Sequence, residues 1–164
     1  GLQIGEEHFI KGFAPELAAL PKLTIAALNG AAAGIAVTMS LNCDLRLAVP
    51  GAALKLNFAE LGVMPGLGST WHLPRLIGTS TAKRLLLCDR TIQSDDALKL
   101  GLVDELCGPA DLIPRAIALC EQAAACKPEI VAAIKACLNE SGERGLADAL
   151  AREAAAAAKL REKS

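Results

Sequence analysis

Two glycine-containing segments hold the residues whose types and spacing could do chemistry. The first, residues 29–37, reads NGAAAGIAV and places a turn before a run of helix formers. Backbone N–H groups at the start of a buried helix are oriented donors, and they can stabilise negative charge that develops on a carbonyl oxygen. The same glycine and alanine pattern would also let a helix pack tightly on a sheet. The spacing alone leaves both interpretations open.

The second segment, residues 64–74, reads MPGLGSTWHLP. A glycine loop before a helix can bind phosphate, but no lysine follows here in the manner of a phosphate-binding loop, so we expect no nucleotide site. His8 and His72 are the only histidines. We predict that His72 is a packed or capping side chain. Two distant histidines offer neither a serine-hydrolase triad nor a metal ligand set, so no metal is expected.

Composition restricts the classes of partner. The 164 residues suit about one domain, and the formal net charge of -1 argues against nucleic acid or an anionic membrane as a partner. No apolar stretch reaches the roughly 20 residues of a spanning helix, and no signal-type segment opens the chain, so a soluble protein is expected. Six cysteines without paired CxxC motifs favour reduced, packed thiols, in the cytoplasm or another reducing compartment.

Apolar periodicity and turn residues predict an α/β protein with alternating elements. Helices are expected where helix formers run between caps, with Ser94 as one such cap and Gly101 as a stop signal. The expected strands are 22–30, 45–49, 53–58 and 102–106. The expected helices are one or two within 6–19, then 31–44, 80–88 and 94–100, and three after residue 110. A hinge at 107–109 divides an α/β core, 1–107, from a C-terminal helical region, 108–164.

Three segments of this chain resemble the crotonase family, the enoyl-CoA hydratases and isomerases, in unbroken order. They are PKLTIAALNGAAAGIAVTMSLNCDLRLA, LKLNFAELGVMPGLGSTWHLPRLIG and AKRLLLCDRTIQSDDALKLGLVDEL. The similarity runs from about Leu17 to Leu106. It implies a spiral of β-β-α units with a C-terminal helical region, and the family's N-terminal part has no counterpart before Gly1.

The resemblance also implies a chemistry. Members of the family bind acyl-CoA thioesters, with coenzyme A as part of the substrate and no separate cofactor, and they usually assemble as homotrimers or hexamers. Their shared device is an oxyanion hole of two backbone amides that holds the enolate of the thioester. Aligned on Asn29-Gly30 and Cys43-Asp44, the second amide belongs to Ile35, which follows Gly34.

The chain departs from the family's pattern at the acid/base positions. Thr38 stands where hydratases carry one glutamate, and Phe58 stands where they carry the other. Gly66 occupies the position at which some isomerases keep an acid. Because positioned acid/base groups each contribute roughly 100- to 10,000-fold, efficient hydration is not expected. Glu60 is the nearest carboxylate, a weak candidate for a substitute base.

The resemblance makes the 64–74 segment the rim of an acyl pocket. Pro65, Gly66 and Leu67, together with Thr38 and Phe58, are the expected substrate-binding residues, and Trp71 is expected to pack behind them. The family's first oxyanion amide lies in the missing N-terminal part. Removal of one such donor costs about 3 kcal/mol of transition-state stabilisation, so we expect the 164-residue chain alone to be inactive.

The sequence leaves two functions open. The first is an acyl-CoA enzyme of fatty acid metabolism that relies on enolate stabilisation, an isomerase or a decarboxylase (a lyase) rather than a hydratase. The second is a non-catalytic crotonase-like module that binds acyl-CoA or supports an assembly. A protease that shares the spiral fold is disfavoured because no Ser-His pair is placed for it.

Overall fold

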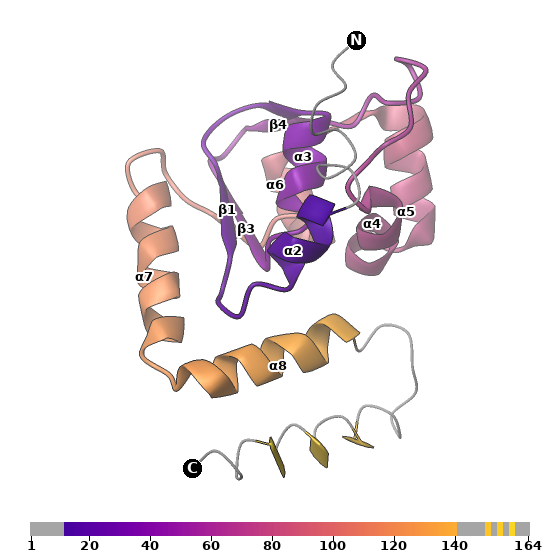
Figure 1. Cartoon of the computed structure of the whole chain (residues 1–164). Coiled ribbons are helices and arrows are strands. Elements are labelled where there is room, and N and C mark those ends of the chain that lie inside the picture. Colours follow the sequence, from indigo (N-terminus) through magenta and orange to yellow (C-terminus); the bar gives the residue numbers. More distant parts are fainter. Residues whose placement is uncertain (1–11, 141–149, 152–153, 156–157, 160–164) are drawn as a thin grey trace.

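Two small sheets form the centre of the structure, a computed structural model that describes residues 12–140, 150–151, 154–155 and 158–159 (Figure 1). The first sheet is parallel and has the strand order β1-β3-β6. The second has the order β2-β4-β5, in which β2 and β4 are parallel and β5 is antiparallel. The strands are β1 (Ile25–Leu28), β2 (Ala32–Ala33), β3 (Leu45–Ala48), β4 (Ala53–Lys55), β5 (Thr91–Gln93) and β6 (Glu105–Leu106).

The chain winds through both sheets in successive turns. In the first turn β1 joins one sheet, β2 joins the other, and helix α3 (Ile35–Ser40) follows. In the second turn β3 and β4 take the neighbouring places, with Ile25 opposite Leu45 and Ala32 opposite Leu54. Helices α4 (Ser69–Ile77) and α5 (Thr79–Arg84) follow, and α5 continues into the π-helical turn η2 (Leu85–Asp89). The β-β-α spiral expected from the sequence is therefore confirmed.

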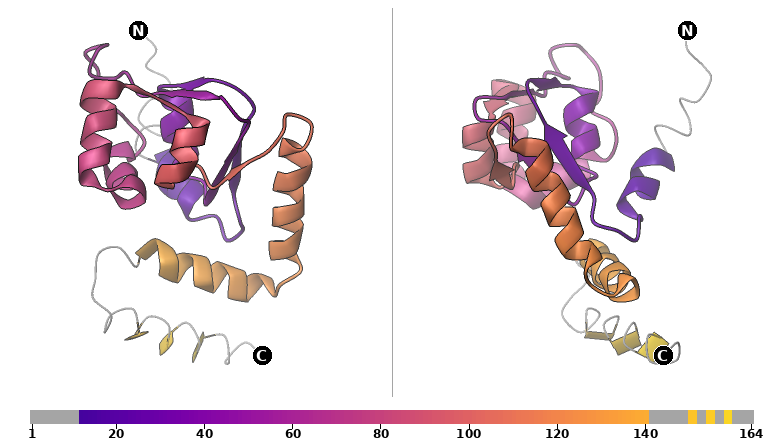
Figure 2. Two further views of the ribbon diagram at one scale, coloured as in Figure 1. Left: turned by 180° about the vertical axis from the view of Figure 1, so that it is seen from behind. Right: turned by 90° about the vertical axis from the view of Figure 1, so that its left-hand side faces the viewer.

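Two apolar clusters pack on opposite sides of the first sheet. The larger lies among the second sheet and helices α3 to α6, where α6 is Ser94–Leu100, and it includes the fully buried Leu54, Leu56 and Leu73. The smaller joins Leu47 of β3 to Leu112 at the start of α7 (Leu112–Ala124). Figure 2 shows α7 along the first sheet, on the side away from α4 and α5.

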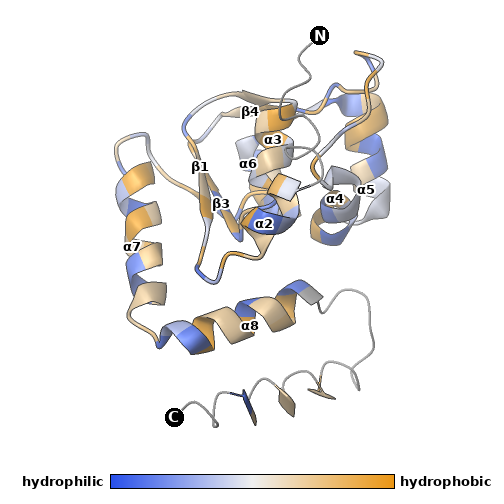
Figure 3. Cartoon of the chain, viewed as in Figure 1, coloured by the Kyte–Doolittle hydropathy of each residue, from blue (hydrophilic) through white to orange (hydrophobic). Residues whose placement is uncertain are grey.

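The helical region after residue 107 is attached to the core in two different ways. Helix α7 is packed through Leu112 and carries Arg115, whose Nε lies 2.7 Å from Oε1 of Glu105. Helix α8 (Pro128–Glu140) is held by polar contacts: Nζ of Lys135 donates to Oδ2 of Asp44 at 2.7 Å and to the carbonyl of Lys22 at 2.9 Å. Figure 3 shows polar and apolar residues alternating along both helices.

Several elements differ from those expected. The strand predicted over 53–58 ends at Lys55. The amide of Leu56 still donates to the carbonyl of Arg90, but Arg90 has φ 60°, outside the extended region, so the pairing of β4 with β5 stops there. Helix α4 occupies 69–77, where Gly66, Gly68 and Pro74 indicate a loop. The helix forms despite an internal proline because Leu73 and Ile77 are buried in the core.

Of the predicted helix ends, one is confirmed and one is wrong. Gly101 ends α6 in the left-handed region with φ 80°, as expected. Ser94 is not a cap: its hydroxyl donates to the carbonyl of Val49 at 2.8 Å and accepts from the amide of Ala52 at 3.1 Å. It therefore ties α6 to the turn between β3 and β4. The helix α2 (Ala14–Ala18) begins with Pro15 in its first turn, and residues 6–11 of the predicted segment lie outside the described residues.

Of the three helices predicted after residue 110, α7 and α8 are confirmed, and most of the third lies outside the described residues. All six cysteines are free thiols, and Cys88 and Cys126 are exposed, so the prediction that the thiols are packed is wrong for these two. Within the described ranges, no helix combines the length and apolar character needed to cross a bilayer.

A buried guanidinium connects three parts of this fold. The Arg46 side chain, in the middle of β3, is 4% exposed. Its Nε donates to the carbonyl of Leu102 at 2.8 Å, its Nη1 to the carbonyl of Cys43 at 3.0 Å and its Nη2 to Oδ2 of Asp104 at 3.0 Å. The same carboxylate oxygen accepts the Arg46 amide at 2.7 Å. Arg46 thus joins the end of α3, the first sheet and the connection to β6.

Replacing Arg46 by methionine should lower the free energy of unfolding by about 3 kcal/mol, because Asp104 and two buried carbonyls lose their charged donor. Urea denaturation followed by circular dichroism measures the change. Lys99→Ala is the matched control: it removes the exposed Lys99–Asp96 pair, whose atoms are also only 2.7 Å apart, and its unfolding midpoint should stay close to that of the unmodified protein. Equal losses in the two variants would contradict the structural role of Arg46.

Candidate active site

The backbone at Gly34 fixes the direction in which α3 begins. Gly34 has φ 53° and ψ -115°, a combination that glycine adopts readily and other residues rarely do. Its amide donates to the carbonyl of Lys55 on β4 at 2.9 Å, and its carbonyl accepts the amides of Val37 and Thr38, both at 3.1 Å. Gly34 is therefore held from both sides, to the second sheet and to its own helix.

The next amide, that of Ile35, is the predicted oxyanion donor. Among the described residues it has no hydrogen-bond acceptor, as is usual for the first N–H groups of a helix. The Ile35 side chain is 55% exposed, so it is not packed into the core. An oriented N–H group is therefore present at the position that the sequence indicates.

Two predicted substrate-binding residues lie close to this turn. The Phe58 ring is half-buried against the larger core cluster, and two of its carbons lie 4.0 Å from the place where a Gly34 β-carbon would be. Thr38, one turn into α3, is 1% exposed, and its hydroxyl donates to the carbonyl of Ile35 at 3.3 Å. Phe58 thus borders the turn directly, whereas the Thr38 hydroxyl is directed back into its own helix.

The predicted rim, residues 65–67, is attached to the far end of the same helix. Leu67 is buried, and its φ of 53° lies in the left-handed region. Its carbonyl accepts Nδ2 of Asn42 at 3.0 Å, and the same nitrogen donates to the carbonyl of Thr38 at 3.0 Å. Oδ1 of Asn42 lies 3.1 Å from Nε2 of His72. Pro65 is half-buried and Gly66 is exposed.

The structure therefore brings most of the predicted residues around α3. Gly34, Ile35 and Phe58 meet at its start, and Thr38 is linked to Leu67 through Asn42. No hydrogen bond among the described residues links Pro65 or Gly66 to Ile35. Sequence reasoning missed Asn42. A polar residue between Leu41 and Cys43, just after a buried helix, was the only available signal.

The titratable groups around the site do not include a positioned carboxylate among the described residues. Glu60, the candidate substitute base, is exposed, and its Oε2 lies 3.4 Å from Nη1 of Arg90. Burial lowers the pKa of His72, and the positive charges of Arg46 and Arg75 lower it further. His72 is therefore a packed, hydrogen-bonded side chain, as predicted from the sequence. In the part of the chain that the structure describes, no group of three or more His, Cys, Asp or Glu side chains could hold a metal ion.

Trp71 differs from the sequence-based expectation. The sequence predicts that it packs behind the wall of the acyl pocket, but its side chain is 38% exposed. The guanidinium carbon of Arg75 lies 3.9 Å from the centre of the indole ring, a cation–π contact. The indole therefore contributes to an outer surface shared with Arg75.

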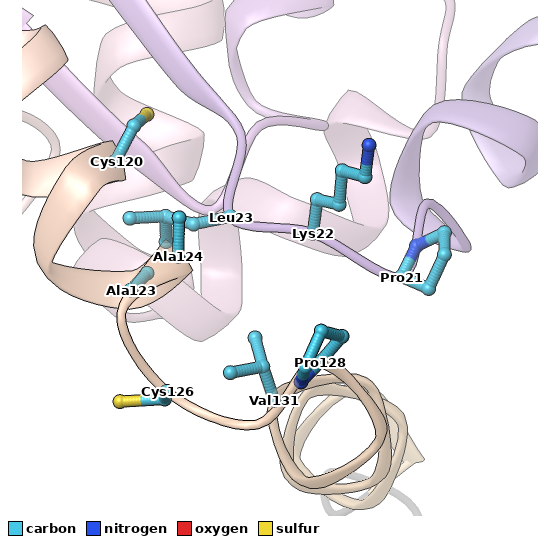
Figure 4. A pocket seen from close by; sticks show the side chains of 9 residues that line it. All are labelled: Pro21, Lys22, Leu23, Cys120, Ala123, Ala124, Cys126, Pro128 and Val131. Carbon is cyan, nitrogen blue, oxygen red and sulfur yellow. The ribbon is translucent and has the colours of Figure 1, made fainter.

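Two hollows lie at the other end of α3 and beyond it. A groove of about 870 Å³ separates α8 from the core and is lined by Leu41, Asn42, His72, Arg75 and Lys135, among others. A smaller hollow of about 280 Å³ lies at the turn between α7 and α8 (Figure 4) and is lined by residues from both helices and from the segment 21–23, among them Leu23, Cys126 and Val131. Neither is lined by Gly34 or Ile35, so neither is the candidate thioester site.

Comparisons with known proteins agree with this architecture. The family model of the enoyl-CoA hydratases/isomerases matches residues 7–164. YngF of Bacillus subtilis (strain 168), named as an enoyl-CoA hydratase/isomerase, is 40% identical over 137 residues, which are 84% of this chain and 53% of that protein. A glyoxysomal fatty acid beta-oxidation multifunctional protein of Brassica napus is 38% identical over 97 residues, 59% of this chain and 13% of that protein.

Solved structures show the same relationship. The crystal structure of an enoyl-CoA hydratase from Bacillus anthracis matches with a TM-score of 0.86 at 34% identity, over 91% of this chain and 58% of the other. An enoyl-CoA hydratase/isomerase from Cupriavidus metallidurans CH34 matches with a TM-score of 0.85 at 33% identity, over 90% and 56% respectively. This chain thus spans little more than half the length of these relatives.

The wound β-β-α turns and the helix that starts after Gly34 are those of a crotonase-fold protein. The chain belongs to the enoyl-CoA hydratase/isomerase family.

Replacing Gly34 by alanine should lower the free energy of unfolding by about 1–3 kcal/mol, because the β-carbon makes φ 53° and ψ -115° unfavourable even though Phe58 leaves room for it. Thermal unfolding at several urea concentrations measures this loss. Gly30→Ala is the control, since no heavy atom lies within 4 Å of its added β-carbon, and it should leave stability nearly unchanged. A neutral Gly34→Ala variant would contradict the described backbone.

The lowered pKa of His72 predicts a pH dependence of stability. The unfolded chain binds a proton at histidine near pH 6.5, about the usual pKa, whereas the folded protein binds it at lower pH. The contribution of His72 to stability is therefore complete above about pH 6.5 and is lost as the pH falls from there towards the folded pKa. His72→Gln should flatten this part of a curve of unfolding free energy against pH. An identical slope in the variant would refute the assignment.

Proposed function

We propose that the protein acts on acyl-CoA thioesters and stabilises an enolate of the thioester through the backbone N–H of Ile35. The observation that carries the proposal is an amide without an acceptor among the described residues, placed by Gly34 at the start of α3 in a member of this family. A neutral N–H that is already oriented stabilises developing negative charge without reorganisation. A second donor is expected from outside the described residues.

The proposed reaction class is isomerisation or decarboxylation rather than hydration. Hydration needs one group to activate water and another to deliver a proton, and positions 38, 58 and 66 are threonine, phenylalanine and glycine. Decarboxylation of a malonyl-type thioester needs no base. The C–C bond to the carboxylate breaks, its electron pair enters the enolate, carbon dioxide leaves, and a proton is later added at the α-carbon.

We also infer the cofactor requirement, the oligomeric state and the cellular compartment of the protein. The substrate supplies coenzyme A, so no separate cofactor is proposed. A homotrimer or hexamer is supported by the apolar side chains that α7 and α8 expose, among them Ile113, Ile117 and Ile134. Free thiols at all six cysteines support a reducing compartment such as the cytoplasm.

The amide itself can be tested by Ile35→Pro, which removes the N–H group at a helical position that tolerates proline. The intact protein is incubated with acetyl-CoA in deuterated water and with malonyl-CoA, and α-proton exchange and carbon dioxide release are measured. We expect the unmodified protein to catalyse at least one of the two. The Ile35→Pro variant should lose about 100- to 1000-fold in kcat.

Ile35→Val is the control because it keeps the N–H group and a β-branched side chain. It should retain the rate of the unmodified protein within a few-fold, and circular dichroism should show that both variants fold. Absence of exchange and of decarboxylation in the intact unmodified protein would overturn the proposal. Equal rates in the Pro and Val variants would overturn the role of the amide.

The second candidate function is a non-catalytic module that binds acyl-CoA. It is favoured by one observation, the lack of a carboxylate at all three positions where hydratases and isomerases of the family carry one, with the Thr38 hydroxyl turned to the carbonyl of Ile35. This alternative predicts that calorimetry detects acyl-CoA binding while the exchange and decarboxylation assays stay at background.

A further inference from the structure

We propose that Asn42 is a positioning residue that sets the shape of the acyl pocket by clamping the rim at Leu67 to helix α3. The proposal rests on the proposed function, because the acyl pocket that Asn42 would shape is the one expected from the sequence at Thr38, Phe58 and the rim. Asn42 touches neither the expected thioester position nor the Ile35 amide, so it acts through the residues that it holds.

Both the nitrogen and the oxygen of the Asn42 side-chain amide have hydrogen-bond partners. It is 5% exposed, and its Nδ2 donates to the carbonyls of Thr38 and Leu67, both at 3.0 Å. These two carbonyls belong to residues 38 and 67, which are far apart in the sequence and are both predicted to contact substrate. One buried NH2 group therefore fixes the distance between the helix that carries the oxyanion amide and the rim of the pocket.

The rim needs such a clamp because its backbone is strained. Leu67 adopts φ 53°, a left-handed backbone conformation that residues with a β-carbon rarely adopt. Its side chain is buried at 4% exposure, which holds one side of the residue, and the hydrogen bond to Asn42 holds the carbonyl on the other. Without that bond the peptide between Leu67 and Gly68 is free to relax, and residues 65–67 move with it.

The two carbonyls fix which way the Asn42 amide faces, and the amide in turn fixes the tautomer of His72. Nδ2 already donates to two carbonyls, so Oδ1 is the atom that meets Nε2 of His72 at 3.1 Å, and it can only accept. Nε2 therefore carries a proton, and the neutral ring keeps its lone pair on Nδ1. This orientation gives every polar atom of the amide a matching partner. A flipped amide would place Oδ1 of Asn42 against the two carbonyl oxygens, with no hydrogen between them.

The clamp therefore predicts an effect on acyl-chain selection. Loss of the Leu67 contact should disturb the part of the pocket that meets carbons beyond the thioester, while the Ile35 amide stays in place through the Gly34 to Lys55 hydrogen bond. Binding of a long acyl chain should therefore weaken, whereas binding of an acetyl group should stay the same.

The experiment compares α-proton exchange of octanoyl-CoA and acetyl-CoA in deuterated water, using the intact protein. Asn42→Ala should raise KM for octanoyl-CoA roughly tenfold, with KM for acetyl-CoA and both kcat values within about twofold, because misplaced binding groups weaken only the contacts they make. Asn42→Ser keeps one donor and should give an intermediate ratio. It also serves if Asn42→Ala does not fold.

Ser94→Ala is the matched control. Like Asn42, Ser94 is a buried polar residue that joins two segments, but it lies between α6 and the turn after β3. It should lower Tm without changing the octanoyl-to-acetyl ratio. The same ratio in the Asn42 variants as in Ser94→Ala would overturn the positioning role and leave the proposed function intact. Absence of exchange with either thioester in the unmodified protein would overturn this inference, and absence of malonyl-CoA decarboxylation as well would overturn the proposed function.

Discussion

The buried guanidinium of Arg46 is the interaction on which the rest of the fold depends. A charge with only 4% exposure is stable in a protein interior when it is paired and its donors are satisfied, and Arg46 meets both conditions through Asp104 and two backbone carbonyls. Its contact with the carbonyl of Cys43 holds the residue that follows Asn42. The guanidinium of Arg46 in the first sheet thus holds the segment after the end of α3, and the start of α3 carries the candidate site.

Helix α3 is fixed at its two ends by different means. At its start the Gly34 amide is bonded to β4, and after its end the Asn42 side chain is bonded to the helix and to the rim. The orientation of the Ile35 N–H therefore follows from the backbone bond of Gly34 to β4 and from the contacts of the Asn42 side chain, and the Ile35 side chain has no part in it. This explains how a large side chain can occupy the residue after the glycine without loss of the donor.

Much of the fold could be predicted from local signals, because the alternating strand at 45–49 and the helix closed by Gly101 need little from the rest of the chain. Helix α4 could not, since Pro74 and the glycines argue against it and only the burial of Leu73 and Ile77 outweighs them. Ser94 was misassigned because a serine before a helix has the same sequence signature whether its hydroxyl caps the helix or bonds another segment. The residues at the start of α3 followed from the family resemblance, whereas the role of Asn42 depends on a contact 25 residues away.

The backbone amide after Gly34 differs from a carboxylate or an imidazole in one respect that matters for evolution and for solvent conditions. A peptide nitrogen keeps its hydrogen in acidic and in alkaline media alike, and no change of side chain removes it except to proline. A site built on such a donor can exchange its surrounding acids and bases, and with them its reaction, while the feature that all these reactions share persists unchanged.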